Sequence, residues 1–320
     1  MKTITTNDIW RARKRISGFI AATPIIYSAS LSSRLGAEVY LKPECFQVAG
    51  SFKVRGACNK IALIKQGGLN LPLVTCSSGN HGTALAYAAT RIGYPAPVVF
   101  VPEDADSTKV NRIRSYGAEV RARGGDFSET FRIAQDYVQN SGGQYVHSHS
   151  DNEIIAGQGT IGLELLEELP DLDAVVVPVG GGGLISGVAT AVKAGAPQVE
   201  VFGVEAAAAP GAYLSFRDGR CHESITIQPS LADGLLGTLT PLTFSIAARL
   251  VSAIHTVEEA EIAAALKLLL EHEQIIAEGS SVVGLAAVLS GKLDLDGKKT
   301  VFILSGRNIS KEKYLRAVTG

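Results

Sequence analysis

Lys53 is the residue of this chain whose surroundings most favour covalent chemistry. It lies between apolar neighbours in the segment 51–57 (SFKVRGA), with Gly50 and Gly56 on either side. Burial disfavours the ammonium form of a lysine and lowers its pKa, so that the free amine can attack a carbonyl group and form a Schiff base. A surface lysine whose aliphatic stem covers apolar neighbours explains the same segment. The choice between the two interpretations therefore depends on companion motifs.

Two glycine-rich turns are such companions, because each follows an apolar run typical of a buried strand. Residues 72–76 lead into the turn 77–82 (SSGNHG), and residues 174–179 lead into four glycines, namely Gly180, Gly181, Gly182 and Gly183. Without side chains, these glycines let backbone N–H groups converge at the start of a predicted helix, which suits a phosphate. The hydroxyls and N–H groups of the turn 77–82 also precede a predicted helix and suit a carboxylate.

Each turn has a second interpretation. The spacing of Gly181 and Gly183 partly fits the fingerprint of a dinucleotide site, and Glu205 stands where a ribose-binding carboxylate is expected. Ser186, however, occupies a position where that fingerprint requires Gly or Ala. Taken alone, the turn 77–82 is more often a serine-rich helix cap without a ligand. Neither turn decides the function by itself.

The elements that must position these motifs alternate between strand and helix patterns. In the first half of the chain the predicted strands are 72–76, 97–101, 118–122 and 144–147. The alternation resumes after residue 151 and continues to the strand 300–304. This order predicts an α/β fold with doubly wound, mainly parallel sheets. We predict a small domain over residues 71–148, inserted into a large domain made of residues 1–70 and 149–320.

His147 and His149 alternate at the end of the last strand of the predicted small domain. Two histidines on one face of a strand are a partial metal site, but no third ligand lies nearby in the sequence. We interpret this stretch as a strand at the domain boundary.

Composition excludes several classes of function. The chain of 320 residues has 30 basic and 31 acidic side chains, so no excess charge indicates a nucleic acid or an anionic membrane as partner. The longest uncharged run, 174–192, contains Pro178 and the four glycines, which argue against a membrane-spanning helix. The 4 cysteines show no C-x-x-C pair, and the N-terminus lacks the apolar core of a signal peptide. We expect a soluble protein in the reducing cytoplasm.

Taken together, the motifs resemble those of the fold-type-II enzymes that use pyridoxal phosphate (PLP), and within them the branch of serine/threonine dehydratases and serine racemases. The matching motifs follow in order along nearly the whole chain: the segment 51–57, the turn 77–82, G-Q-G-T at 157–160, the four glycines, and Ser305-Gly306. The resemblance implies two domains with PLP in the cleft between them, at the carboxyl ends of strands. It also implies a homodimer.

The resemblance implies roles for the residues around the cofactor. Lys53 would bind PLP as a Schiff base and take the proton from the substrate α-carbon. Phe52 would pack on the ring, and Gly180 to Gly183 would hold the phosphate. Ser305 would hydrogen-bond the pyridine nitrogen. Because a neutral hydroxyl cannot stabilise a protonated ring as a carboxylate would, this contact favours loss of a β-substituent over a long-lived carbanion.

The turn 77–82 would bind the substrate, again by resemblance. Ser77, Ser78, Asn80 and His81 would hold the α-carboxylate, and Asn80 would also reach the ring hydroxyl of PLP. Ser78 would stand opposite Lys53 as a second acid or base.

This pattern predicts a PLP-dependent lyase that dehydrates and deaminates a β-hydroxy amino acid to a 2-oxo acid and ammonia, as in amino-acid catabolism. Threonine, serine or a related hydroxy amino acid is the expected small-molecule substrate. A serine racemase and a hydroxyaspartate-type dehydratase are alternatives, and a nicotinamide-dependent dehydrogenase is the alternative from another class.

Two positions depart from the family pattern. Glu205 and the carbonyl of Ala209 match two members of a divalent-cation site seen in parts of the family, but Gly211 stands where the third, acidic ligand is expected. The cation site is therefore incomplete. Arg307 replaces the second glycine of an S-G-G-N pattern. It is interpretable as an exposed arginine after a strand, or as a cleft residue that pairs with a second substrate carboxylate.

Overall fold

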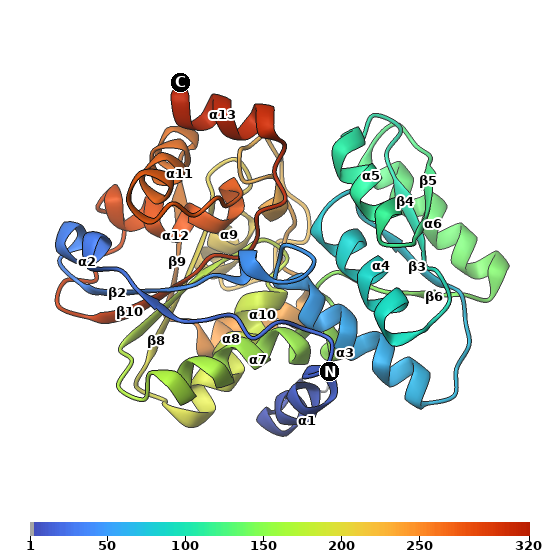
Figure 1. Ribbon diagram of the computed structural model, residues 1–320, viewed down its shortest axis with the longest axis horizontal. Helices are drawn as coiled ribbons and strands as arrows, with labels where there is room; N and C mark the ends of the chain where they lie inside the picture. The colour runs from blue at the N-terminus through green and yellow to red at the C-terminus, as the bar shows by residue number, and fades with distance from the viewer. Residues whose placement is uncertain (1–2) are drawn as a thin grey trace.

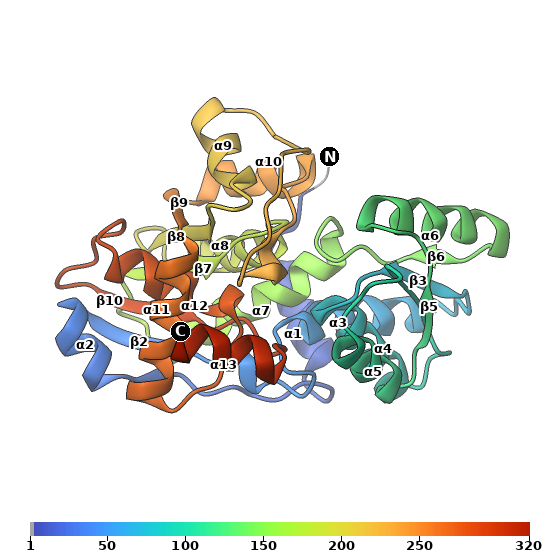
Figure 2. The ribbon, with the colours of Figure 1, turned by 90° about the horizontal axis from the view of Figure 1, so that it is seen from above.

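The computed structural model describes residues 3–320 as two α/β bodies, each built around its own sheet (Figure 1). In Figure 1 and in the perpendicular view of Figure 2, the small body lies beside the large one, with helices α3 (Lys53–Gln66) and α7 (Asn152–Glu168) between the two sheets. Both sheets are parallel except for one edge pair, which confirms the predicted α/β class. The strands of the small sheet all fall within residues 71–148, although the domain boundaries themselves stay a prediction.

The large sheet has six strands in the order β1-β2-β10-β7-β8-β9. These strands are β1 (Ile26–Tyr27), β2 (Glu38–Lys42), β7 (Ala174–Pro178), β8 (Glu200–Ala206), β9 (Ala253–Val257) and β10 (Lys299–Ile303). Only β1 runs antiparallel to its neighbour. The remaining helices of this body are α1 (Thr6–Ile16), α2 (Ala29–Leu35), η1 (Glu44–Phe46), α8 (Gly183–Gly195), α9 (Gly211–Asp218), η2 (Asp233–Leu235), α10 (Pro241–Leu250), α11 (Glu259–Glu273), α12 (Gly279–Leu289) and α13 (Lys311–Thr319).

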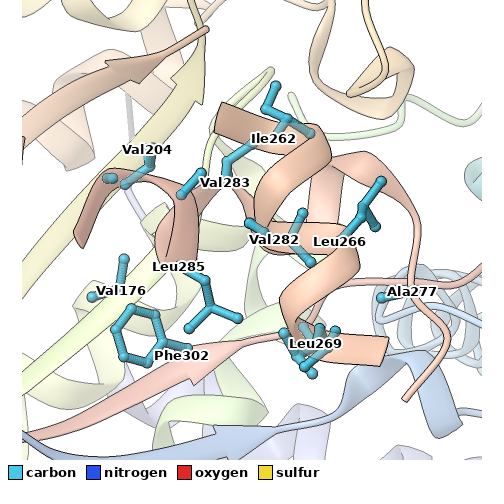
Figure 3. Close-up of a cluster of buried hydrophobic side chains, with 14 of the residues drawn as sticks. Val176, Val204, Ile262, Leu266, Leu269, Ala277, Val282, Val283, Leu285 and Phe302 are labelled. Carbon is cyan, nitrogen blue, oxygen red and sulfur yellow. The ribbon is translucent and has the colours of Figure 1, made fainter. Parts of the chain in front are cut away.

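Alternate residues of the central strands face two separate apolar layers, because successive side chains of a strand point to opposite faces. Val176, Val204 and Phe302 pack against α11 and α12, as Figure 3 shows. Val175 and Val301 face the other way and pack with residues of α7 and α8. A sheet covered on both faces is the reason that these strands read as continuous apolar runs in the sequence.

The small body has four parallel strands in the order β5-β4-β3-β6. Its elements are β3 (Leu73–Cys76), α4 (Asn80–Ile92), β4 (Val98–Val101), α5 (Ser107–Ser115), β5 (Glu119–Ala122), α6 (Phe127–Ser141) and β6 (Gln144–Tyr145). Val74, Val98 and Phe100 pack with α6, whereas Val99 and Val101 pack with α4 and α5. This sheet is therefore also doubly wound.

Glycines allow the helices between the two sheets to approach closely. A Cβ atom on Gly157 of α7 would lie 2.6 Å from the Cα atom of Gly56 in α3. A Cβ atom on Gly159 would lie 2.9 Å from the carbonyl oxygen of Gly187 in α8. The G-Q-G-T motif is thus the point at which α7 crosses its two neighbours, and it places the start of α3 beside the large sheet.

The sequence patterns missed the elements of residues 210–257. Serine, threonine, glycine and proline are frequent there, which hid α9 and α10. Thr240 and Thr243 nevertheless form a capping box, with Pro241 at the first helical position. The short strand β9 within this region was missed as well. The predicted strand 144–147 is also shorter, because the side chain of His147 accepts hydrogen bonds from the N–H groups of His149 and Ser150 in a turn.

No helix in residues 3–320 is long and apolar enough to cross a membrane.

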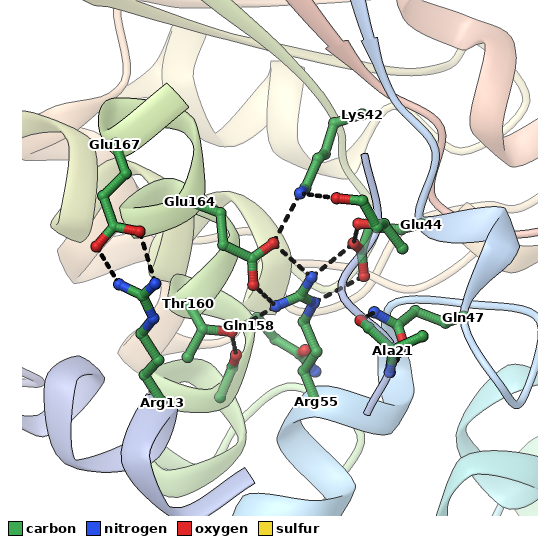
Figure 4. A network of polar contacts seen from close by, with 12 residues as sticks. Arg13, Ala21, Lys42, Glu44, Gln47, Arg55, Gln158, Thr160, Glu164 and Glu167 are labelled. Carbon is green, nitrogen blue, oxygen red and sulfur yellow. Dashed lines mark hydrogen bonds and ion pairs between the residues drawn. The ribbon is translucent and has the colours of Figure 1, made fainter. Parts of the chain in front are cut away.

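A buried cluster of charges fixes α3 against the large body (Figure 4). The guanidinium of Arg55 is fully buried and donates to both carboxylate oxygens of Glu44, each at 2.7 Å. It also donates to Glu164 of α7 at 2.5 and 2.8 Å. Lys42, buried at the end of β2, pairs with the same Glu164 at 2.7 Å. Burial opposes the charge of Arg55, but Glu44 and Glu164 hold its pKa above the ordinary value.

We predict that Arg55→Leu lowers the free energy of unfolding by about 3–5 kcal/mol, because it leaves the carboxylate of Glu44 buried without its guanidinium. Arg13→Leu is the matched control, since Arg13 pairs with Glu167 where the side chains are 33% and 45% exposed. Such a pair contributes at most about 1 kcal/mol. Denaturant unfolding of both variants checks the prediction, and equal losses would contradict it.

Candidate active site

A cavity of about 900 Å³ lies between the two bodies, where the carboxyl ends of strands from both sheets meet. Its lining includes every residue predicted to bind cofactor or substrate, which are Phe52, Lys53, Ser77, Ser78, Asn80, His81, Gly180, Gly181, Gly182, Gly183 and Ser305. The roles of these residues stay predictions, but the fold brings all of them to one cavity from four separate stretches of the chain.

Lys53 begins α3 and reaches into this cavity. Its Nζ atom donates to the carbonyl oxygen of Ser148 at 3.0 Å and lies 5.0 Å from the ring centre of Phe52. Burial lowers the pKa of Lys53 to about 8, against the opposing effect of the charge on Glu278. The amine therefore has a substantial neutral fraction near physiological pH, as a nucleophile or base requires.

The backbone joins Lys53 to Ser305. The N–H group of Phe52 donates to the carbonyl oxygen of Ser305 at 3.0 Å, and Ser51 forms a bridge with Gly306. The hydroxyl of Ser305 lies 3.2 Å from that of Ser281, whose own hydrogen is directed to the carbonyl oxygen of Gly306 at 2.6 Å. Ser305 can therefore give its hydrogen either to Ser281 or to a ligand in the cavity.

The four glycines form a concave surface at the start of α8. Gly182 has φ +80°, in the left-handed region that favours glycine, and a Cβ atom there would overlap Leu239. A Cβ atom on Gly180 would lie 2.9 Å from Leu235, and one on Gly181 would overlap the ring of His149. Glycine at these positions thus lets neighbouring residues pack directly on the backbone. The turn lines the cavity at the start of α8, and within residues 3–320 its N–H groups have no acceptor, which fits a phosphate group.

The turn 77–82 differs from the predicted arrangement in how its side chains are used. The hydroxyl of Ser77 accepts from the N–H groups of Gly79 and Gly82 at 3.4 and 3.2 Å, so it caps α4. His81 is buried with its Nε2 atom 3.1 Å from the carbonyl oxygen of Val146. Burial and the charge of Lys53 lower the pKa of His81 to about 3, so its ring is neutral. Within residues 3–320, the hydroxyl of Ser78 has no hydrogen-bond partner and remains available to a ligand.

Glu278 is a cavity residue that the sequence patterns did not indicate. It caps α12, and its carboxylate accepts from the side chain of Asn80 at 2.7 Å and from the N–H group of Asn308 at 2.9 Å. Burial and the charge of Asp233 raise the pKa of Glu278 to about 7. Asn308 also donates to the side-chain oxygen of Asn80 at 2.5 Å. The one available signal was an isolated carboxylate in an otherwise uncharged stretch, 274–291.

The structure does not support the interpretation of the four glycines as part of a dinucleotide-binding site. Glu205, the candidate ribose ligand, does not line the cavity. Its carboxylate accepts instead from the N–H groups of Ala212 and Tyr213 at 3.0 and 2.7 Å, at the start of α9. Ser186 is buried and contacts the carbonyl oxygen of Thr243.

The residues of the predicted cation site do not fit a metal either. Both oxygens of Glu205 bind backbone N–H groups, and the carbonyl oxygen of Ala209 accepts from Gly211 at 2.9 Å. In the described part of the chain, no three acidic, histidine or cysteine side chains form a group able to hold a metal ion. Burial raises the pKa of Glu205 to about 8, against the opposing effect of the N–H groups of Tyr213 and Ala212.

Arg307 lies outside the cavity. Its side chain is exposed and is not part of the lining, while its N–H group donates to the carbonyl oxygen of Gly50 at 2.9 Å. The structure thus agrees with the interpretation of Arg307 as a surface residue, and the hypothesis that it reaches the cleft is wrong. Residue 307 is exposed, whereas Ser305, two residues earlier, is buried and lines the cavity.

Comparisons with known proteins match this chain over nearly its whole length. Residues 16–306 match the family described as pyridoxal-phosphate dependent enzyme. An L-threonine ammonia-lyase of Thermotoga maritima is 43% identical over 307 residues, which cover 96% of this chain and 76% of the relative. A serine racemase of Dictyostelium discoideum is 39% identical over 312 residues, which cover 97% and 96% of the two chains. The structure of maize serine racemase has a TM-score of 0.92 and 32% identity, covering 99% and 98%.

We predict that the amine of Lys53 is acylated by acetic anhydride with a pH midpoint near 8, as its lowered pKa requires. A lowered pKa means that the reactive neutral amine appears at lower pH. Mass spectrometry of the cofactor-free protein after brief labelling measures this midpoint. Because the charge of Glu278 raises the pKa of Lys53, Glu278→Gln should move the midpoint lower still. A midpoint at the ordinary value of 10.5 would contradict the prediction.

Proposed function

The chain belongs to the family of pyridoxal-phosphate-dependent enzymes, and we propose that it removes water and then ammonia from a β-hydroxy amino acid of the threonine or serine type. The product is the corresponding 2-oxo acid. One observation supports this proposal most strongly. The amine of Lys53, the glycine cradle and the hydroxyl of Ser305 all line the same cavity. A relative named L-threonine ammonia-lyase is 43% identical to the chain.

The residues around the cavity provide a binding frame for the cofactor. Lys53 would hold its aldehyde carbon, the N–H groups of the glycine turn would hold its phosphate, and Phe52 would pack against the ring. Asn80, fixed by Glu278 and Asn308, would reach the ring hydroxyl. When bound, PLP supplies a ring that withdraws the electron pair left on the substrate α-carbon. Ser305 offers the pyridine nitrogen a neutral hydroxyl, which favours elimination of a β-hydroxyl.

The substrate carboxylate has a binding site in the backbone of the turn 77–82. Within residues 3–320, the N–H groups of Ser78, Asn80 and His81 have no acceptor and lie at the start of α4, where the helix dipole favours an anion. This differs from a site built mainly from side chains, since the hydroxyl of Ser77 and the amide of Asn80 already have protein partners. The backbone of the turn would orient the α-carbon toward Lys53.

Lys53 would move the proton of the reaction. Its pKa of about 8 allows the neutral amine to take a proton from the α-carbon. The β-hydroxyl leaves as water together with the proton that Lys53 removed, and hydrolysis of the product, which consumes one water, then releases ammonia. The net change is therefore one amino acid to one 2-oxo acid and one ammonia.

The charges of the cavity favour a substrate with a single carboxylate. Two lysines, Lys53 and Lys109, are the only lysines or arginines among the described lining residues. Lys109 already pairs with Asp233 at 2.7 Å, and the histidines in the cavity are held neutral. A second substrate carboxylate, as in hydroxyaspartate, would have no free cation to bind. Threonine and serine therefore fit better than an acidic substrate.

The first test is a screen for 2-oxo acid formed from threonine, serine and 3-hydroxyaspartate. Threonine or serine should give the highest kcat/KM, while the acidic substrate should be poor. Absence of 2-oxo acid from all of them would contradict the proposal. Reduction of the yellow holoenzyme with borohydride should attach the cofactor to the peptide that contains Lys53, which a nicotinamide enzyme would not do.

We predict that Lys53→Ala abolishes both the yellow colour and the release of ammonia, because no other cavity lysine is free to hold the cofactor and take the proton. Lys53→Arg should fail as well, since a guanidinium stays protonated. Absorbance spectra and an ammonia assay measure the two effects. Turnover at the parent rate by either variant would exclude this role for Lys53.

Racemisation of serine is a second candidate function, because the hydroxyl of Ser78 is free in the cavity and a relative named serine racemase is 39% identical to the chain. If Ser78 is the second acid or base, Ser78→Ala should reduce racemisation much more than dehydration of the L-substrate, by at least about tenfold. Cofactor binding should not change. Equal losses in both activities would assign Ser78 to carboxylate binding alone.

A homodimer in the cytoplasm completes the proposal. All 4 cysteines are free, as a reducing compartment would keep them. Sedimentation equilibrium would test the oligomeric state.

A further inference from the structure

His149 lies against the glycine cradle and has no part in the reaction outlined above. A Cβ atom on Gly181 would overlap three atoms of its imidazole ring, and one on Gly183 would lie 2.9 Å from the Cβ atom of His149. The ring therefore packs directly on the backbone of the turn. It lines the same cavity as Lys53. Any group held by the cradle is a neighbour of this imidazole.

One nitrogen of the ring is engaged and the other is free. The Nδ1 atom lies 2.9 Å from the hydroxyl of Ser148, and the ring meets that of His147 edge-on at 4.5 Å. Within residues 3–320, Nε2 has no hydrogen-bond partner, and the side chain keeps partial exposure. If Ser148 donates to Nδ1, the neutral ring carries its hydrogen on Nε2. This nitrogen is then a donor available to the cavity.

The surroundings of His149 keep its ring neutral. Burial, followed by His147, Lys53 and His81, holds the pKa of His149 well below the ordinary value. These residues lie on the adjoining turn, on α3 and on α4. A dianion beside the ring would oppose their effect and raise the pKa of the imidazole. A neutral imidazole with its hydrogen on Nε2 can donate that hydrogen to an anion.

We propose that Nε2 of His149 binds the phosphate of PLP, so that an imidazole completes the backbone cradle of Gly180 to Gly183. Ser148 is a positioning residue in this arrangement, because its hydroxyl selects the tautomer with hydrogen on Nε2. The inference rests on the proposed function for its cofactor. A second anion, the substrate carboxylate, has the same chemistry, so the test must separate the two.

The test compares parent holoenzyme with His149→Phe and His149→Gln. Phenylalanine keeps a ring against Gly181 but has no donor, whereas the amide of glutamine restores one. Equilibrium dialysis measures the Kd of PLP, and of pyridoxal, which lacks the phosphate. His149→Phe should weaken PLP about tenfold, which corresponds to about 1.4 kcal/mol. Pyridoxal should bind equally to parent and variant, and His149→Gln should recover part of the loss for PLP.

A measurement on the parent enzyme makes the test independent of how the variants fold. With ¹⁵N-labelled histidine, the Nε2 resonance of His149 should shift on binding of PLP but not of pyridoxal. Resonance assignment needs only one variant, since the chain has 6 histidines.

Equal losses for PLP and pyridoxal would overturn the inference, as would an unshifted resonance. An unchanged Kd of PLP with a raised KM for threonine would assign His149 to the substrate instead, and would also overturn it. A parent enzyme that bound no PLP would reject the proposed function together with the inference.

Discussion

A charge that is buried away from water must be paired with opposite charges. The pairing of Arg55 fixes the position of α3, the helix that carries Lys53 into the cavity. The guanidinium of Arg55 requires Glu44 from the segment after β2 and Glu164 from α7. Lys53 precedes it by two residues on the first turn of α3. Because the partners of Arg55 belong to the large body, they fix the position of the helix that carries the reactive amine. The close crossing of Gly56 and Gly157 brings these partners within reach.

The cavity combines this rigid frame with groups kept near neutrality. Burial lowers the pKa of Lys53 and of His81, and raises that of Glu278. Uncharged forms of an amine, an imidazole and a carboxyl group are those that transfer protons without the cost of desolvating a charge. The backbone N–H groups of two helix starts, α4 and α8, then provide the positive ends that hold anionic parts of cofactor and substrate. The protein thus meets the anionic parts of the ligands with backbone dipoles.

Glu205 shows how one residue can serve a different purpose within a shared fold. The same buried carboxylate that the family pattern assigns to a cation here binds two N–H groups at the start of α9. A Cβ atom on Gly211, the first residue of α9, would lie 2.9 Å from Thr238. The positive end of α9 lies next to the carboxyl group of Glu205. A family motif therefore predicts where a residue such as Glu205 lies in the fold, but it does not predict which groups its side chain contacts.

Local signals in the sequence determined the α/β class, most of the strand and helix positions, and the motifs that carry the chemistry, because glycine turns, apolar runs and helix starts depend on neighbouring residues. Glu278 and Asn308 lacked such signals, since each acquires its partners from segments far along the chain. The sequence also left open the place of Arg307, whose side chain is exposed in the fold. Only the tertiary structure decided which groups share a cavity, because long-range contacts bring them together. It also decided which of these groups have shifted pKa values, because burial sets the shifts.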